Sequence, residues 1–105
     1  MWELPYAPTL GHPARLAGRV VVVGFVAWFL GVVEQFRFFD LTVYPCADPA
    51  VAVAEVKAEA QIKPTGRRYR QEYVVFLRAA GGKIAFLREY FNPVWAAQAM
   101  DVPTV

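Results

Sequence analysis

A carboxylate, a phenol and an amine in the second half of the chain are the side chains whose types and spacing could support catalysis. Glu89, Tyr73 and Lys57 occupy three consecutive segments in which apolar and polar residues alternate, as in antiparallel strands. A carboxylate in a dry pocket has a raised pKa, and a nearby ammonium lowers that pKa again. This balance is how proteins prepare general acids and bases, so Glu89 is the candidate acid or base, with Tyr73 and Lys57 as orienting groups.

Two tight turns predict the register that would align these side chains. A turn over residues 63–67 would place Lys57 opposite Tyr73, and a turn at residues 81–82 would place Tyr73 opposite Glu89. Opposite side chains on neighbouring strands lie about 5 Å apart, so the three would form one row, with Glu55 on the same face as a ligand-binding candidate. The same row is also typical of a solvated strand face with cross-strand ion pairs, and a slip of one residue would exchange the faces of a strand.

An apolar helix is expected to cover this face. Residues 18–31 (GRVVVVGFVAWFLG) are rich in β-branched side chains, but the run is too long for a typical strand and its aromatic residues fall at helical spacing. Apolar character on all sides predicts burial on all sides, with Trp28 packed against the sheet. The ligand-binding wall is expected to come from aromatic and aliphatic side chains of this helix and the last strand: Phe25, Trp28, Phe29, Leu87 and Phe91.

The length of the uncharged run argues against a membrane partner. Residues 20–33 lack any charge, whereas a membrane-spanning helix needs about 20 apolar residues. We therefore expect a buried core helix and no association with a membrane.

Composition excludes several other classes of protein. The net charge is only +2, from 11 basic and 9 acidic residues, which does not create the positive field of a nucleic-acid-binding protein. The single cysteine, Cys46, cannot form an internal disulfide, so we expect a reducing, cytoplasmic location. Cys46 and the single histidine, His12, are too few for a zinc site, and a Cys/His catalytic pair would rest on one residue of each kind. We expect no metal, no cofactor and no nucleic-acid partner.

The remaining periodicity predicts one α+β domain over residues 1–105. A short strand (1–6) and a proline-containing loop (7–17) precede the helix. Two-residue alternation between turn signals then predicts a meander of four antiparallel strands, and Asn92-Pro93 predicts the start of a short closing helix that ends at Met100. The four strands are 34–44, 50–62, 68–79 and 83–91.

Short motifs in a fixed order resemble the SnoaL-like branch of the nuclear transport factor 2-like superfamily. The closing segment GKIAFLREYFNP (82–93) is similar to the family ending G-K-I-x-x-x-R-E-Y-x-[DN]-P, and the opening WELPYAP (2–8) with Gly18-Arg19 is similar to its first strand and third helix. Asp48-Pro49 with VAE (53–55) is similar to its middle hairpin. The resemblance covers about residues 2–100. It implies a cone-shaped curved sheet around one helix, with an interior pocket, and commonly a dimer formed through the sheet.

The resemblance also bears on the activity. Ketosteroid isomerases of this superfamily place a catalytic Asp before a proline in the first strand, where this chain has Leu4. They also take a tyrosine from an N-terminal helix, which we do not find here. The Asp-Arg-Asp set of limonene epoxide hydrolase cannot be placed either, because Asp40 and Asp48 fall on a strand and a turn. Phenazine-biosynthesis-type proteins use a pocket glutamate in the closing R-E-[FY] motif, and Glu89 occupies that position.

The family normally begins with two helices that this chain lacks, since Met1 falls where the first strand should start. The chain would be a natural short form or a truncated reading frame, and its exposed apolar surface would favour a homodimer. Two functions remain open. The first is an enzyme or binder for an apolar, ring-containing small molecule, of isomerase, cyclase or hydrolase type. The second is a non-catalytic dimeric binding or assembly module whose interior is filled. Whether the chain is an enzyme is left undecided.

Overall fold

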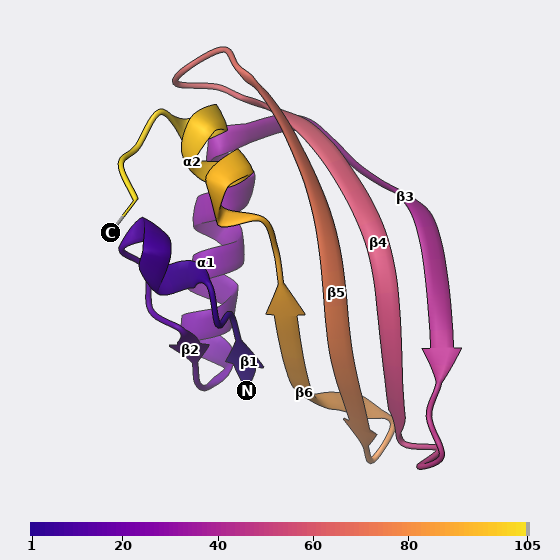
Figure 1. Ribbon diagram of the computed structural model, residues 1–105. Coiled ribbons are helices and arrows are strands. Elements are labelled where there is room, and N and C mark those ends of the chain that lie inside the picture. The colour runs from indigo at the N-terminus through magenta and orange to yellow at the C-terminus, as the bar shows by residue number, and fades with distance from the viewer. Residues whose placement is uncertain (105) are drawn as a thin grey trace.

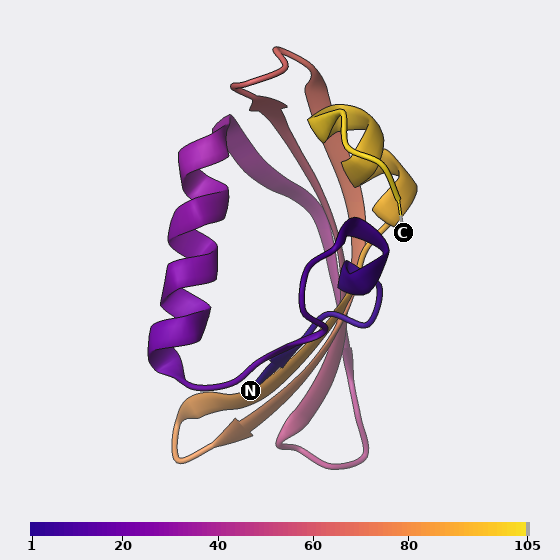
Figure 2. The same ribbon diagram turned by 90° about the vertical axis from the view of Figure 1, so that its left-hand side faces the viewer.

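The protein is a curved six-stranded sheet with one long helix on its concave side and a short helix at one end (Figures 1 and 2). The computed structural model describes residues 1–104. The strands lie in the order β2-β1-β6-β5-β4-β3. This arrangement confirms the predicted α+β cone around one helix.

Four long strands form the predicted antiparallel meander. They are β3 (Val33–Pro45), β4 (Val51–Ile62), β5 (Arg68–Ala80) and β6 (Lys83–Tyr90). The prediction relied on apolar and polar residues that alternate between turn residues. The structure confirms all four segments as strands. The meander carries most of the surface that faces the long helix, so its register decides which side chains reach the interior.

The curvature of the sheet has a local cause in β3. The register shifts twice along this strand, between Glu34 and Arg37 and between Phe39 and Thr42. Gln35 and Asp40 each adopt φ 54° at these irregularities. Bulges of this kind bend a strand and increase its twist, so β3 curls toward the long helix.

Two short strands complete the sheet, and only the second of them was not predicted. β1 (Trp2–Glu3) pairs in parallel with β6 and antiparallel with β2 (Arg15–Leu16), which makes the sheet mixed. A 3₁₀ turn, η1 (Ala7–Leu10), lies between them. The strand predicted over residues 1–6 is confirmed at Trp2–Glu3. β2 lies in the predicted loop 7–17, because a strand of two residues is too short for periodicity to detect.

The long helix α1 (Arg19–Val32) meets the sheet on only one side (Figure 2). None of its residues is buried, and exposure reaches 87% at Val20 and 43% at Trp28. The predictions of burial on all sides and of a buried Trp28 were therefore wrong. An apolar sequence shows which sides of a helix could be buried, but another part of the protein must pack against a side to bury it. Within residues 1–104, no helix is long and apolar enough to cross a membrane.

The short helix α2 (Pro93–Met100) closes one end of the cone. The Asn92 side chain caps it by accepting hydrogen bonds from the backbone N–H groups of Val94 (3.0 Å) and Trp95 (3.1 Å), and Pro93 occupies the first turn. Three alanines of α2 are buried. Ala96 and Ala99 join Ile62 and Tyr69 in the main core cluster. The helix thus seals the cone beside the interior cavity.

Candidate functional site

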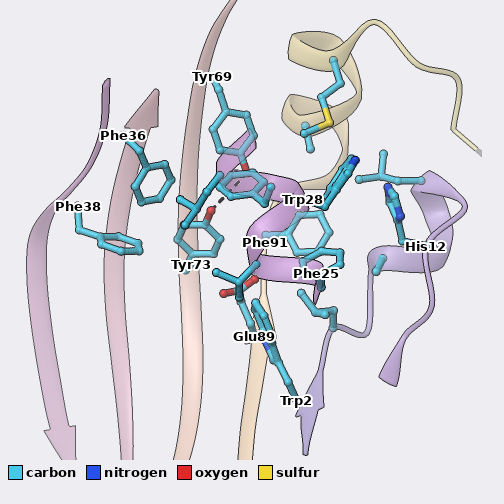
Figure 3. A pocket seen from close by; sticks show the side chains of 18 residues that line it. Trp2, His12, Phe25, Trp28, Phe36, Phe38, Tyr69, Tyr73, Glu89 and Phe91 are labelled. Carbon is cyan, nitrogen blue, oxygen red and sulfur yellow. Dashed lines mark hydrogen bonds between the residues drawn. The ribbon is translucent and has the colours of Figure 1, made fainter. Parts of the chain in front are cut away.

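An apolar cavity of about 280 Å³ lies between α1 and the concave face of the sheet. This volume is close to the lower end of small-molecule pockets, which begin at about 300 Å³. Its walls are mainly aromatic and aliphatic (Figure 3). Residues from α1, η1, α2 and four strands line it: Trp2, Leu4, Ala7, Leu10, His12, Phe25, Val26, Trp28, Phe29, Leu30, Phe36, Phe38, Tyr69, Tyr73, Glu89, Phe91, Ala96 and Met100.

Glu89 is the only carboxylate among the lining residues. It projects from β6 and lies among Tyr73, Phe91 and Trp2 (Figure 3). Burial raises the pKa of Glu89 to about 7. No cation within residues 1–104 forms an ion pair with Glu89, so no nearby positive charge offsets the rise in pKa caused by burial. A carboxyl group in this state can give or take a proton near neutral pH.

The predicted row of Lys57, Tyr73 and Glu89 is not formed, because the register was wrong in both hairpins. Lys57 lies opposite Glu72, and Val56 takes the position opposite Tyr73. The turn after β4 is shorter than predicted, since the backbone N–H of Ile62 donates to the carbonyl of Arg67 (2.8 Å). A slip of one residue moves every side chain of a strand to the other face.

Lys57 and Glu55 therefore lie on the outer face of the sheet, away from the cavity. The Lys57 ammonium lies 3.5 Å from the Asp40 carboxylate. The Glu55 carboxylate is near the Tyr44 hydroxyl and raises the pKa of Tyr44. These are the cross-strand polar contacts of a solvated face, the alternative that the sequence had left open.

Glu89 lies opposite Val75, two residues from the predicted position. The pairing of β5 with β6 shifts between Arg78 and Ala79, and this irregularity moves the register. Because the shift is by two residues, Glu89 keeps the predicted face and shares it with Tyr73. Its nearest cross-strand neighbour is nevertheless apolar.

Of the five residues predicted to form the wall, Phe25, Trp28, Phe29 and Phe91 line the cavity. Leu87 lies on the same face of β6 but opposite Leu77 and Trp2, outside the lining set. The aromatic rings of the wall contact one another edge to face. Phe29 packs on Phe36 (5.7 Å between centroids) and on Tyr69 (6.0 Å).

Three polar side chains of β5 form a hydrogen-bonded row, in which Tyr69 and Tyr73 line the cavity and Gln71 does not. The Tyr69 and Tyr73 hydroxyls are 3.3 Å apart, and the Gln71 Nε2 group lies 3.3 Å from the Tyr69 hydroxyl. Gln71 also bonds both backbone groups of Asn92. Burial raises the pKa of Tyr73 far above its ordinary value, and burial is also the main reason that the pKa of Tyr69 rises. Both phenols are thus neutral hydrogen-bonding groups.

The N-terminal segment supplies five lining residues that sequence reasoning missed: Trp2, Leu4, Ala7, Leu10 and His12. His12 packs against Trp28 (5.2 Å between centroids) and Phe25 (6.2 Å). Trp2 packs edge to face on Phe25, and its indole Nε1 is a buried donor with no hydrogen-bond partner within residues 1–104. Neither Trp2 nor His12 lies in a periodic segment. The pairing of β1 with β6 places Trp2, and the loop between η1 and β2 places His12.

Tyr69 and Gln71 were also missed as site residues, although both fell on the face predicted for Tyr73. Alternation along β5 was the available signal, since residues 69, 71 and 73 share one side of the strand. Within residues 1–104, no group of three or more His, Cys, Asp or Glu side chains could hold a metal ion.

Comparison with known proteins agrees with this architecture. The family model described as SnoaL-like domain matches residues 1–87. The chain belongs to the SnoaL-like domain family. The resemblance found in the motifs is thereby confirmed.

Three relatives of this SnoaL-like chain are informative. YesE, an uncharacterized protein of Bacillus subtilis, is 30% identical over 94% of this chain and 67% of its own length. An uncharacterized PhzA/B-like protein of Pseudomonas aeruginosa is 31% identical over 93% of this chain and 68% of its own length. A solved structure of a candidate isomerase from B. subtilis has 30% identity and a TM-score of 0.87, over 95% of this chain and 71% of that one. The cone fold is therefore shared with a solved relative.

Proposed function

We propose that this SnoaL-like domain binds an apolar, ring-containing small molecule in the cavity beneath α1, and that Glu89 acts on it as a general acid or base. The observation that carries the proposal is the Glu89 carboxyl, which lines an apolar cavity without a paired cation and whose pKa is raised by burial to about 7. Structural carboxylates are normally ionised and paired, so an unpaired one in a pocket is a functional candidate.

The reaction type that fits best is a proton transfer of the isomerase or cyclase kind. Ionised Glu89 would take a proton from a ring carbon next to a carbonyl, and the electron pair of that C–H bond would become an enolate. The protonated carboxyl would then return the proton to the same or another atom of the ring. A solved relative with 30% identity is described as a candidate isomerase, which supports this choice. A hydrolase would need Glu89 to activate a water molecule instead.

The Tyr73 hydroxyl is the proposed orienting group beside Glu89, and Phe25, Trp28, Phe29 and Phe91 would contact the ring. We assign no such role to Lys57 or Glu55, since both lie on the outer face. Leu87 would support the ring-binding wall from its place on β6, opposite Trp2 and Leu77. The reaction needs neither a metal nor a cofactor in this scheme.

The second candidate function is a non-catalytic dimeric binding or assembly module with a filled interior. The cavity of about 280 Å³ argues against filling. Dimer formation is compatible with both functions, and we propose a homodimer because large apolar side chains are exposed on α1 and β3. They include Val20, Val23, Leu30, Phe38, Leu41 and Val43. A cytoplasmic location is proposed from the single cysteine, without a nucleic-acid or membrane partner.

Exchange of carbon-bound hydrogen tests the catalytic proposal. The protein would be incubated in D₂O with a panel of small ring ketones, and deuterium next to the carbonyl would be followed by NMR. We expect exchange above the buffer rate, with a pH profile that bends near 7, and loss of the added exchange in Glu89→Gln. Glu55→Gln is the matched control, because it makes the same change on the outer face. Equal exchange by the parent and by Glu89→Gln would refute the role of Glu89.

A further inference from the structure

Glu3 is the centre of a cluster of charges on the outer face of the sheet. Its Oε2 accepts a hydrogen bond from Arg88 Nε at 2.9 Å, and its Oε1 accepts one from Arg15 Nη2 at 3.2 Å. The Glu3 side chain is only 15% exposed, and the hydrogen bond from Arg88 is the main reason that its pKa is lowered. Since the three residues come from β1, β2 and β6, the cluster connects the three strands at this edge.

The strand that carries Glu3 has few other contacts along its length. β1 pairs with β6 through two residues, Trp2 opposite Leu87 and Glu3 opposite Arg88. The Leu87 N–H also donates to the Met1 carbonyl at 3.0 Å. A two-residue strand forms few ladder hydrogen bonds, so side-chain contacts must hold it in the sheet. The buried Leu4 provides such a contact at one end of β1, and the charges on Glu3 provide the other.

Trp2 lies on the opposite face of β1 from Glu3, because successive side chains of a strand alternate. It lines the cavity beside Glu89 and packs edge to face on Phe25, with 5.5 Å between centroids (Figure 3). The buried indole Nε1 has no hydrogen-bond partner within residues 1–104. An unpaired buried N–H disfavours this placement, so other contacts of β1 must offset it. The ion pairs of the adjacent residue, Glu3, are suited to do so.

We propose that Glu3 is a positioning residue for Glu89: its ion pairs with Arg88 and Arg15 keep β1 on β6, so that Trp2 excludes water from the cavity beside the Glu89 carboxyl. The proposal rests on the proposed function in taking Glu89 as the acid or base. It adds a control of that carboxyl by charges outside the cavity. Release of β1 would let water reach Glu89, and hydration favours the ionised form of a carboxyl group.

Few other ionisable groups share the cavity with Glu89. Among the lining residues they are His12, from the loop after η1, and Tyr69 and Tyr73 of β5. The lining residues of α1, α2 and β3 are not ionisable. Variants of Glu3 leave all of these groups unchanged, so a change in the titration of Glu89 reports on its exposure to water or on the charges of the cluster itself.

The titration of Glu89 is the first test. In carbon-13 NMR of carboxyl-labelled protein, we expect Glu3→Gln to increase the acid dissociation constant of Glu89 by at least about threefold, because hydration lowers its pKa. Glu59→Gln is the matched control. Glu59 also accepts hydrogen bonds from two arginines on the outer face, Arg37 and Arg68, but it lies on β4, away from β1. The Glu59→Gln protein should titrate at Glu89 like the parent.

A direct effect of charge on Glu89 is separated by Arg88→Gln. Loss of the Glu3 charge would by itself lower the pKa of Glu89, whereas loss of the Arg88 charge would by itself raise it. Release of β1 lowers the pKa in both variants, so we expect a fall in Arg88→Gln as well. In a Trp2→Ala background the wall is already absent, and Glu3→Gln should then change the dissociation constant by less than about 1.5-fold.

Hydrogen exchange of the Trp2 indole N–H measures the position of β1 directly. We expect exchange at least about fivefold faster in Glu3→Gln and Arg88→Gln than in the parent, because local opening exposes a buried N–H. The indole N–H of Trp95 on α2 is the reference within the same protein and should be unchanged. Arg15→Gln removes the longer of the two ion pairs and should give a smaller change in the same direction, which keeps the test available if Glu3→Gln does not fold.

Four results would overturn the proposal. They are unchanged Trp2 exchange in Glu3→Gln, a raised pKa of Glu89 in Arg88→Gln, an equal effect of Glu3→Gln with and without Trp2, and an equal change in Glu59→Gln. These measurements use no ligand, so they do not depend on the proposed reaction. The expected changes in Glu3→Gln, together with no exchange chemistry in the parent, would reject the reaction and retain the positioning role of Glu3.

Discussion

Glu89 on β6 lies opposite Val75 on β5, so its cross-strand neighbour is a hydrocarbon and not a charge or a phenol. Tyr73 lies on the same face of β5, two positions before Val75. Together with Tyr69 it forms the polar part of the cavity wall. This separation leaves Glu89 without compensation for burial, which is why its pKa is raised.

Stability should depend on pH through Glu89. The pKa of Glu89 is about 7 in the folded protein, against about 4.3 in an unfolded chain. The folded state holds the proton more tightly, so this contribution to the free energy of unfolding is fully present below pH 4.3 and is lost as pH rises to 7. Glu89→Gln should therefore be more stable than the parent at pH 8, by up to about 3 kcal/mol, and similar to it at pH 4. Urea denaturation at both pH values measures this difference. A Glu89→Gln protein less stable at pH 8 would mean that the carboxylate is held by a favourable contact.

The pKa of Glu89 should not respond to Lys57. Lys57 lies on the outer face beside Asp40, so Lys57→Met removes no charge near the cavity. Carbon-13 NMR of carboxyl-labelled protein, with the Glu89 resonance assigned by its loss in Glu89→Gln, should show the same titration near 7 in the parent and in Lys57→Met. A clear rise of the Glu89 pKa in Lys57→Met would restore the predicted row of polar residues.

The cap of α2 should contribute measurably to stability. Asn92→Ala removes the side-chain acceptor for the backbone N–H groups of Val94 and Trp95, and we expect a loss of about 1 kcal/mol. Asn92→Asp keeps an acceptor oxygen there and should stay within about 0.5 kcal/mol of the parent. Thermal denaturation of the three proteins compares them. Equal losses in both variants would show that the side-chain cap is not the source of the effect.

Trp28 should behave as a wall residue with an exposed edge. It is 43% exposed, so Trp28→Ala should cost about 1–2 kcal/mol, less than the 3–5 kcal/mol of a buried tryptophan. Ile62→Ala, at a site only 2% exposed, should cost about 2–5 kcal/mol and provides the comparison. Chemical denaturation measures both. A larger loss at Trp28 than at Ile62 would indicate that a further surface covers α1 in solution.

The proposed homodimer predicts a particle of twice the chain mass in sedimentation at micromolar concentration. The exposed apolar side chains of α1 and β3 are the surface that such an interface would bury. A clean monomer under these conditions would reject the dimer, and the cavity proposals would be unaffected.

The sequence by itself determined the kinds of element, their order and the identity of the acid or base candidate. Two-residue alternation and turn residues defined four strands, helical spacing of Phe25, Trp28 and Phe29 defined α1, and the R-E-Y motif marked Glu89. These features are local, because propensity, periodicity and turn chemistry act over a few neighbouring residues.

Only the tertiary structure decided which side chains meet in the site. A turn shorter by one residue turned Lys57 and Glu55 outward, and an irregularity in the β5–β6 pairing placed Glu89 beside Val75. Pairing of the two-residue strand β1 with β6 brought Trp2 to the cavity. Each of these outcomes depends on a register set between distant segments, and the side-chain period of two makes a single-residue change reverse a face. The exposure of α1 was likewise decided by which of its sides found a neighbour.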